Sequence, residues 1–260
     1  MNGSAARTSA PHESAADGAA EPTYDGYLRL PTILTAQAPT TARSDRCTHA
    51  AEHFFIVAHQ SCELWLKQAL LDLGLATDAV RSRPRDLELC LEQVRRVTHV
   101  LAVIAEHFTV LERLTVASFA RFRGALGRAS GAQSKQFRAL YRALGLYGAD
   151  SELFRGFLSA LAERDLTVTE VYRRAPHSGL PYLLAEGLVD LSQAVRRCQL
   201  AHVEVVVRQI GARPGTGRTT GADFLAKRLA VPFPELWEAR AALHTAGAVD
   251  SVGVGVQYDR

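Results

Sequence analysis

The sequence predicts an all-α protein built as a helical bundle. Apolar residues recur every three or four positions in several long stretches, which is the period of one face of a helix. No stretch alternates apolar and polar residues as a half-buried strand does, and no segment repeats at a fixed length. With 260 residues, 47% of them hydrophobic and 22% charged, the chain can bury a substantial core.

The helices are expected, in chain order, from these stripes and from the residues that interrupt them. Pro31 can open a short helix through Leu34. Thr115 or Ser118 can cap another short helix, and Gly211 is placed to end the last long one. The other expected helices run from about residue 48 to the break at 82–84, from 86 to about 114, over 133–145, 150–163 and 167–173, and from the break at 176–181 to residue 210. The tail from residue 247 shows no helical period.

Composition limits where the protein works and what it binds. Residues 1–22 are rich in small and polar residues and lack the regions of a signal peptide, which predicts a disordered tail ahead of one domain, residues 23–260. The four cysteines show no CxxC spacing, so we expect reduced thiols, in the core or half-buried, in a cytoplasmic protein. No apolar run is long enough to cross a membrane. The net charge of +3 and the scattered arginines argue against a nucleic-acid partner.

Two histidines lie on apolar stripes far apart in the chain, His59 in the first long helix and His202 in the last. A neutral imidazole brings one donor and one acceptor, and both need partners in a core. Each ring could bond a carbonyl one turn back, and spacing alone favours this interpretation for His59 and leaves it open for His202. Together they indicate a cofactor between them, for which we expect heme, with His202 on the iron and His59 opposite. His49 and His53 lack a third ligand for zinc and are expected on a helix surface.

A glycine-rich loop, residues 215–221, follows the last long helix. A dinucleotide fingerprint needs glycine at the sixth position after a strand, whereas this loop has Thr220 there and follows a helix. The Gly-Lys-Ser/Thr end of a P-loop is also missing. We therefore exclude nucleotide binding and interpret the loop as a lid that offers hydroxyl and backbone N–H groups to a small ligand.

Arg123 is a candidate for binding a carboxylate. It follows Phe122 directly and lies four residues after Phe119, which would place it at the mouth of a pocket. A guanidinium group can hold a carboxylate through two parallel hydrogen bonds. We expect the nearby Arg121 and Arg128 to be solvated surface residues.

Short sequence blocks occur along the chain in an order that is typical of one family. The blocks are Tyr24-Asp-Gly-Tyr-Leu28, Phe55-Ile-Val-Ala-His-Gln60, Glu63-Leu-Trp65 with Lys67, Phe122-Arg-Gly-Ala-Leu-Gly127, Ala129-Ser-Gly131, Gln133-Ser134, Gln136-Phe-Arg138, His202-Val203, Ile210-Gly211, Gly215-Thr-Gly217 and Phe233-Pro-Glu-Leu-Trp237. They cover most of the chain between residues 24 and 240, and their common order makes the signal specific. In these blocks the chain resembles the tryptophan 2,3-dioxygenase family.

The resemblance implies an all-α heme b enzyme, typically a homotetramer, in which the N-terminal segment closes over a neighbour's active site. By resemblance, His202 is the proximal iron ligand, and His59 is the distal residue that accepts the indole N–H. Phe55 packs on the indole, Arg123 binds the carboxylate, and Thr216, with a heme propionate, meets the ammonium group. Further pocket residues implied in this way are Tyr24, Tyr27 and Leu28 from the adjacent subunit, Phe119, and Ser130 with Gly131 beside the pocket.

The implied reaction uses dioxygen as cosubstrate and opens the indole ring of L-tryptophan to N-formylkynurenine. The sequence departs from the family pattern at several positions. Phe119 replaces a tyrosine, Ala132 replaces a phenylalanine and Arg218 replaces a glycine. The segment Gln199-Leu-Ala201 replaces bulkier residues, and only Glu52 remains of an acidic pair. Relatives in natural-product pathways insert a single oxygen into a tryptophan derivative, such as β-methyltryptophan, and give a 2-oxindole. Monooxygenation is therefore an alternative. A non-catalytic heme sensor with His59 as sixth ligand is another, and a helical scaffold without cofactor is a third.

Overall fold

The computed structural model describes residues 21–217 and 219–245, and all regular structure within these ranges is helical. This confirms the all-α class that the apolar stripes predict. The chain divides into two compact units, Met1–Ala38 and Pro39–Arg260. Among the described helices, none combines the length and apolar composition that a bilayer span requires.

The described part of the first unit contains two short helices, α1 (Tyr24–Leu28) and α2 (Leu30–Ile33). The hydroxyl of Thr23 caps α1 by accepting the backbone N–H of Gly26 at 3.2 Å. Arg29, with a φ of 55°, separates the two helices. No residue of either helix is buried, so both present their side chains to the outside of this unit.

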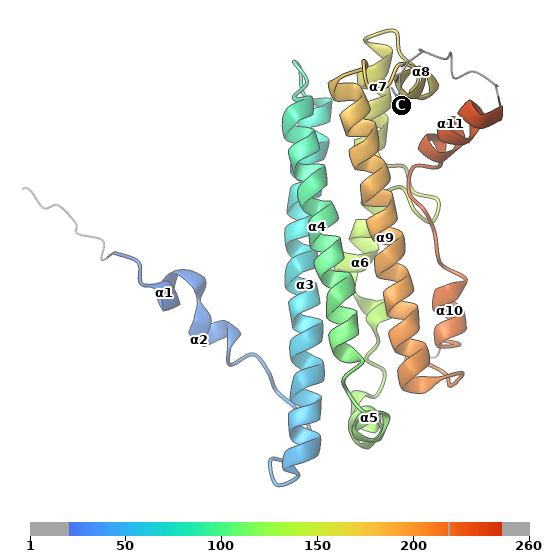
Figure 1. Ribbon diagram of the computed structural model, residues 1–260. Helices are drawn as coiled ribbons and strands as arrows, with labels where there is room; N and C mark the ends of the chain where they lie inside the picture. Colours follow the sequence, from blue (N-terminus) through green and yellow to red (C-terminus); the bar gives the residue numbers. More distant parts are fainter. Residues whose placement is uncertain (1–20, 218, 246–260) are drawn as a thin grey trace, which may run out of the picture. The chain divides into compact units, whose positions relative to one another are not determined.

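Three long helices form the core of the second unit: α3 (Arg46–Arg81), α4 (Leu87–Leu111) and α9 (Leu180–Ile210). Figure 1 shows them side by side, and α4 packs against both α3 and α9. The predicted stripes face inward, because their members Leu66, Val97, Ile104, Leu188 and Leu191 are all fully buried. Burying an aliphatic side chain of this size stabilises the fold by about 1.5–3 kcal/mol, which makes this three-helix contact the main source of stability.

Capping residues explain where these helices begin and end. The carboxylate of Asp45 accepts the N–H of Thr48 at 3.2 Å, so α3 begins two residues before the predicted start at residue 48. Asp86 caps α4 in the same way through Leu89 at 2.9 Å. Gly211, with a φ of 56°, ends α9, which confirms its predicted role as a C-cap.

Shorter helices cover the three long ones. They are α5 (Val116–Arg123), α6 (Lys135–Ala143), α7 (Glu152–Ala162) and α8 (Val168–Arg173), with single-turn 3-10 helices at Gly124–Leu126 and Gly131–Gln133. Thr115, rather than Ser118, caps α5. Helices α5, α6 and α7 all pack against α3, so the segment between residues 116 and 134 is held close to that helix.

Helices α10 (Ala222–Ala226) and α11 (Pro234–Thr245) were not predicted by periodicity. With five residues, α10 is too short to show a stripe. Phe233 and Leu236 are buried at the start of α11, which packs against α8 and α9. These two helices carry the chain back along α9 after the glycine-rich loop.

A buried carboxylate ties the segment before α3 to this helix. Glu52 accepts four hydrogen bonds, from the backbone N–H and hydroxyl groups of Thr40 and Thr41. His49 joins the same cluster, with Nδ1 2.8 Å from the carbonyl oxygen of Thr41. The predicted surface position is therefore correct for the exposed His53 and wrong for His49, which is partly buried.

Three of the four cysteines, Cys62, Cys90 and Cys198, are buried free thiols, as predicted. Burial raises the pKa of Cys62 to about 11 and that of Cys198 to about 12, so both stay protonated at neutral pH. The fourth, Cys47, is exposed near the start of α3, where the prediction of a core or half-buried thiol is wrong.

Candidate active site

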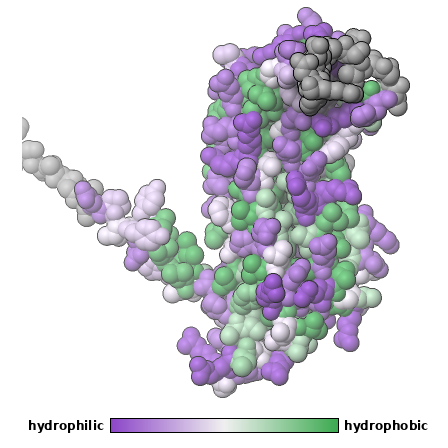
Figure 2. Space-filling model, viewed as in Figure 1, coloured by the Kyte–Doolittle hydropathy of each residue, from purple (hydrophilic) through white to green (hydrophobic). Residues whose placement is uncertain are grey.

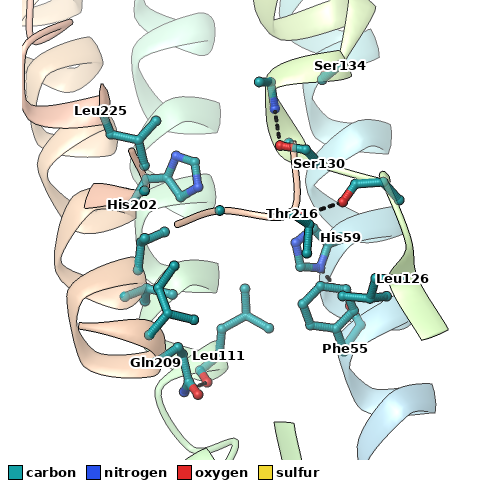
Figure 3. Close-up of a pocket in the computed structure, with 18 of the residues that line it drawn as sticks. Phe55, His59, Leu111, Leu126, Ser130, Ser134, His202, Gln209, Thr216 and Leu225 are labelled. Carbon is teal, nitrogen blue, oxygen red and sulfur yellow. Dashed lines mark hydrogen bonds between the residues drawn. The ribbon is translucent and has the colours of Figure 1, made fainter. Parts of the chain in front are cut away.

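The second unit contains a cavity of about 470 Å³ between α3, α4 and α9. Helix α5, the turns at residues 124–134, the glycine-rich loop and α10 close its remaining sides. Figure 3 shows His202 on one side of the cavity and Phe55 with His59 on the other. Most of the other lining side chains are apolar, so the two histidines face each other across a largely apolar space.

His202 projects from α9 without a hydrogen-bond partner among the described residues, and the open part of its side chain faces the cavity. Its ring stacks on Phe108 of α4, with ring centroids 5.0 Å apart and an interplanar angle of 13°. Burial, and then the nearby His59, lowers the pKa of His202 to about 4. The imidazole is therefore neutral at physiological pH, with an unshared electron pair available to a ligand.

His59 projects from α3 and is held differently. Its Nδ1 lies 2.7 Å from the carbonyl oxygen of Phe55, and because a carbonyl can only accept, Nδ1 must carry the proton. Burial lowers the pKa of His59, although the bond to Phe55 and the charge of Glu63 act in the opposite direction. The exposed surface of the ring faces the cavity, so its Nε2 offers a free acceptor there.

The bond from Nδ1 to the carbonyl four residues back recurs on these helices. His99 and His107 of α4 form it at 3.1 and 2.8 Å, as His59 does on α3. His202 does not form it. The interpretation of a core histidine with satisfied hydrogen bonds thus holds for one of the two nitrogens of His59. It fails for His202, because no described residue bonds either of its nitrogens.

Aromatic rings build one end of the cavity. The ring of Phe55 lies 5.7 Å from that of Phe119 and 5.6 Å from that of the buried Phe122, and it also contacts His59 at 4.0 Å. Phe55 and Phe119 line the cavity, as predicted. This end offers flat apolar faces, and Phe119 brings no hydroxyl group to it.

Arg123, at the end of α5, lines the cavity and is the only arginine or lysine among its described lining residues. One of its terminal nitrogens donates to the carbonyl oxygen of Pro214 at 2.6 Å, which links α5 to the glycine-rich loop. A guanidinium has five N–H donors, so most of this fork is free for an anion. Arg121 and Arg128 are exposed, as predicted.

The glycine-rich loop packs against the turn that carries Ser130 and Gly131. The hydroxyl of Thr216 donates to the carbonyl oxygen of Ala129 at 2.6 Å. A Cβ at Gly217 would come within 2.8 Å of the Ser130 hydroxyl, so only glycine allows this close approach. Thr216, Ser130 and Gly131 all line the cavity, as predicted. Arg218, which replaces a glycine of the family pattern, lies outside the described residues.

Three predicted pocket residues, Tyr24, Tyr27 and Leu28, lie on α1 in the first unit. Their side chains are 74%, 77% and 38% exposed, so this unit does not bury them itself. Their expected place in a neighbour's active site stays a prediction.

Sequence reasoning missed several cavity residues, of which Phe108, Glu63 and Gln209 matter most for the chemistry. Gln209 follows His202 by seven residues, a spacing that returns to the same helix face and could have revealed it. Glu63 accepts a hydrogen bond from Gln136 at 2.7 Å and is the only carboxylate among the described lining residues. Phe108 carried no local signal, because its contact with His202 joins two separate helices.

The cavity does not resemble a site for a bare metal ion. Among the described residues, no group of three or more histidine, cysteine, aspartate or glutamate side chains is arranged to hold one. A single imidazole supplies one bond to a metal, so an ion bound by His202 needs its other ligands from a bound molecule. This donor set and the apolar walls fit a metal carried in a macrocycle, which supplies the remaining equatorial bonds.

Comparison with known proteins agrees with this geometry. The profile of the family described as tryptophan 2,3-dioxygenase matches residues 7–153 and 155–243. The tryptophan 2,3-dioxygenase of Burkholderia ambifaria strain MC40-6 is 34% identical, over 93% of this chain and 90% of its own length. The enzyme of the same name from Kineococcus radiotolerans is 33% identical, over 86% of this chain and 92% of its own length. The one from Arthrobacter sp. is 32% identical, over 85% of this chain and 91% of its own length.

The match runs through both histidines, the aromatic end of the cavity, Arg123 and the glycine-rich loop. It therefore covers the described cavity and the helices that build it. The chain belongs to the tryptophan 2,3-dioxygenase family.

Proposed function

We propose that this protein is a heme-dependent oxygenase that acts on the indole ring of L-tryptophan or of a substituted tryptophan. The observation that carries the proposal is the pair of neutral histidines across one apolar cavity. Among the described residues, neither nitrogen of His202 has a hydrogen-bond partner, and Nε2 of His59 is left as an acceptor. The names of the relatives support the same substrate class. Dioxygenation to N-formylkynurenine is the reaction we expect first.

His202 would hold the heme iron from α9, and the surrounding apolar side chains would keep water away from it. The lowered pKa favours this role, because a neutral imidazole keeps the electron pair that a metal needs. Bound heme would supply the binding and activation of dioxygen. The remaining work of the protein is to bind and orient the amino acid.

His59 and the aromatic end would position the indole. An indole N–H can only donate, so it needs an acceptor, and the free Nε2 of His59 is one. The flat faces of Phe55 and Phe119 would pack on the ring. Because the Phe55 carbonyl fixes the tautomer of His59, this acceptor is prepared before the substrate arrives.

Arg123 and Thr216 would bind the two charged groups of the amino acid. The free N–H groups of Arg123 suit a carboxylate, which a guanidinium holds with two bonds. Thr216 donates its proton to Ala129, so the lone pairs of its hydroxyl oxygen are left to accept from an ammonium group. Ser130 and Gly131 would lie beside this end of the substrate.

We also propose that the protein works as a homotetramer, in which residues 23–260 act as one domain and α1 covers a neighbour's cavity. The exposed rings of Tyr24 and Tyr27 support this, because tyrosines of this exposure are common at interfaces. A stripe of exposed apolar side chains on the α3–α4 pair gives a second surface for contact: Val57, Leu64, Leu71, Leu75, Val103 and Val110. Apolar residues interrupt the hydrophilic surface of the bundle in Figure 2.

Monooxygenation to a 2-oxindole is the second candidate, favoured by two changes in the cavity lining. Phe119 and Ala132 both line the cavity, and they stand where the family commonly has tyrosine and phenylalanine. The tyrosine hydroxyl near the carboxylate is therefore absent, and the wall near residue 132 is smaller. Both changes alter how a tryptophan derivative would sit without altering His59 or Arg123.

The test is turnover with isotopically labelled dioxygen. The heme-loaded protein is reduced without oxygen and then given L-tryptophan or β-methyltryptophan with the labelled gas, and the product mass is measured. Two labelled oxygens in a ring-opened product would establish the dioxygenase, and one in an intact oxindole the monooxygenase. No turnover together with a six-coordinate low-spin ferrous spectrum would instead show a heme sensor.

A further inference from the structure

We infer that Phe108 is a positioning residue that fixes the ring plane of His202 for its bond to iron. The inference rests on the proposed function, because it takes His202 to be the axial ligand. Phe108 lies on α4 and is 6% exposed, and it lines the cavity beside His202. It contacts the His202 ring, to which no described residue forms a hydrogen bond.

The stack between the two rings has a definite geometry. The centroids are 5.0 Å apart and the planes differ by 13°, so the phenyl face lies against the imidazole face. Helices α4 and α9 pack along each other, and this packing fixes the backbone positions of the two residues relative to each other. Gly131 lies near the same ring, since a Cβ built at this position would be 3.9 Å from Cε1 of His202.

The usual restraint on a metal-binding histidine is missing here. Such a residue normally donates its second N–H to a carbonyl or carboxylate, which fixes the ring. His202 has no such partner among the described residues, although His99 and His107 of α4 bond the carbonyl four residues back at 3.1 and 2.8 Å. The terminal torsion of a histidine has broad wells, so without that bond its angle must be set by packing.

A ring held by stacking differs chemically from one held by a hydrogen bond. An acceptor at the second nitrogen raises the basicity of the imidazole and strengthens its bond to a metal. A phenyl face fixes orientation without adding that electron density. The geometry therefore assigns orientation to Phe108, and it leaves His202 without the electron density that an acceptor at the second nitrogen would add.

The test compares three full-length variants with the wild type. Phe108→Leu keeps apolar volume and removes the flat face, whereas Phe108→Tyr keeps the face. Phe157→Leu is the matched control, because Phe157 is 1% exposed on α7 and contacts Phe154 outside the cavity. Each protein is prepared without heme and titrated with it, and the iron–histidine vibration of the ferrous form is recorded.

We expect Phe108→Leu to bind heme about 10- to 100-fold more weakly and to shift or broaden the iron–histidine band, as loss of an orienting partner does in other metal sites. Phe108→Tyr should match the wild type in both readouts. Phe157→Leu should lower the melting temperature and leave both readouts unchanged. In the wild type without heme, NMR should show the His202 ring protons shifted upfield by the phenyl face.

Two results would overturn the inference: a wild-type His202 without the upfield shift, or a Phe108→Leu protein with normal heme affinity and an unchanged band. The NMR result decides the matter even if Phe108→Leu does not fold. Failure of the proposed function would look different, since the wild type itself would bind no heme, or His202→Ala would bind it normally.

Discussion

The two sides of the cavity carry the same residue type and hold it in opposite ways. On the α3 side, formed by α3 and α5, His59 bonds the carbonyl oxygen of Phe55 at 2.7 Å, and Arg123 bonds that of Pro214 at 2.6 Å. On the α9 side, formed by α4 and α9, His202 has no hydrogen bond to a described residue and rests on Phe108. Hydrogen bonds hold His59 and Arg123, whereas ring stacking holds His202.

This difference teaches that the second nitrogen decides what a cavity-lining histidine can do. When a carbonyl takes the Nδ1 proton, as for His59, the ring becomes a fixed acceptor for a donor such as an indole N–H. When no described residue bonds either nitrogen, as for His202, the ring keeps both polar atoms for a ligand in the cavity. Position on an apolar stripe is common to both and does not separate these roles.

The largest expected effect is on heme affinity, which substitution of the two histidines should change to very different extents. We expect His202→Ala to weaken heme binding by more than the roughly 10- to 100-fold cost of losing an outer partner, because it removes the axial ligand itself. His59→Ala should change heme affinity by less than about 3-fold, within the usual spread of such measurements. Heme titration followed by the Soret band measures both. Equal losses in the two variants would contradict the different roles assigned to the two sides.

The second effect concerns substrate affinity on the α3 side. Arg123→Ala should raise the KM for the amino acid by about 10- to 100-fold with a smaller change in kcat, because a carboxylate loses a charge-assisted pair worth roughly 1.5–3 kcal/mol. Arg123→Lys should recover part of the loss, since an ammonium keeps the charge without the fork. The exposed Arg121→Ala is the matched control. An unchanged KM for Arg123→Ala would remove the carboxylate role.

A third prediction uses the lowered pKa of His59. The free ring accepts the indole N–H only while it is neutral, and burial keeps it neutral below the ordinary histidine range. As pH falls, kcat/KM should therefore stay constant through about 6.5 and decline only below it. In His59→Ala this acidic decline should disappear and kcat/KM at pH 7 should fall about 10-fold, the cost of one hydrogen bond. A decline centred at 6.5 in the wild type would show that the pKa of His59 is not lowered in the cavity.

The helices were predictable because each stripe is a local property of the sequence. The spacing of Val97, Leu101 and Ile104 matches the helical period and predicts a buried helix face, and all three side chains are buried. Capping was predictable to within a turn, since Gly211 ends α9 where expected, whereas α3 begins at residue 46 because Asp45 is the cap. Short α10 had too few residues for any period to appear.

The site was predictable where a single short segment carries the signal. His59 and His202 stand out on their own stripes, and Arg123 follows Phe122 directly. The stack of Phe108 on His202 joins residues 94 positions apart, and the bond from Arg123 to Pro214 joins residues 91 positions apart. Such contacts depend on how helices are set against each other, which no single stripe encodes.

The smallest expected effect is a change in stability on the α3 side that leaves heme affinity unchanged. Burial alone would raise the pKa of Glu52, but the four hydrogen bonds from Thr40 and Thr41 outweigh it and hold the pKa at about 2, below the ordinary 4.5. A carboxylate of this kind stabilises the fold above pH 4.5, and its contribution is lost as pH falls from 4.5 towards 2. That contribution is at most about 3 kcal/mol.

Glu52→Gln should therefore lower the free energy of unfolding at pH 7 by about 1–3 kcal/mol, which is a few degrees in melting temperature for a domain of this size. The wild-type advantage should shrink as pH falls through 4.5, whereas the same change at the exposed Glu106 should have no such pH dependence. Thermal melts of the three proteins between pH 3 and 7 measure this. Heme affinity should stay normal in Glu52→Gln, because the proximal ligand is carried by the opposite side; a parallel loss of heme would show that the two sides are not independent.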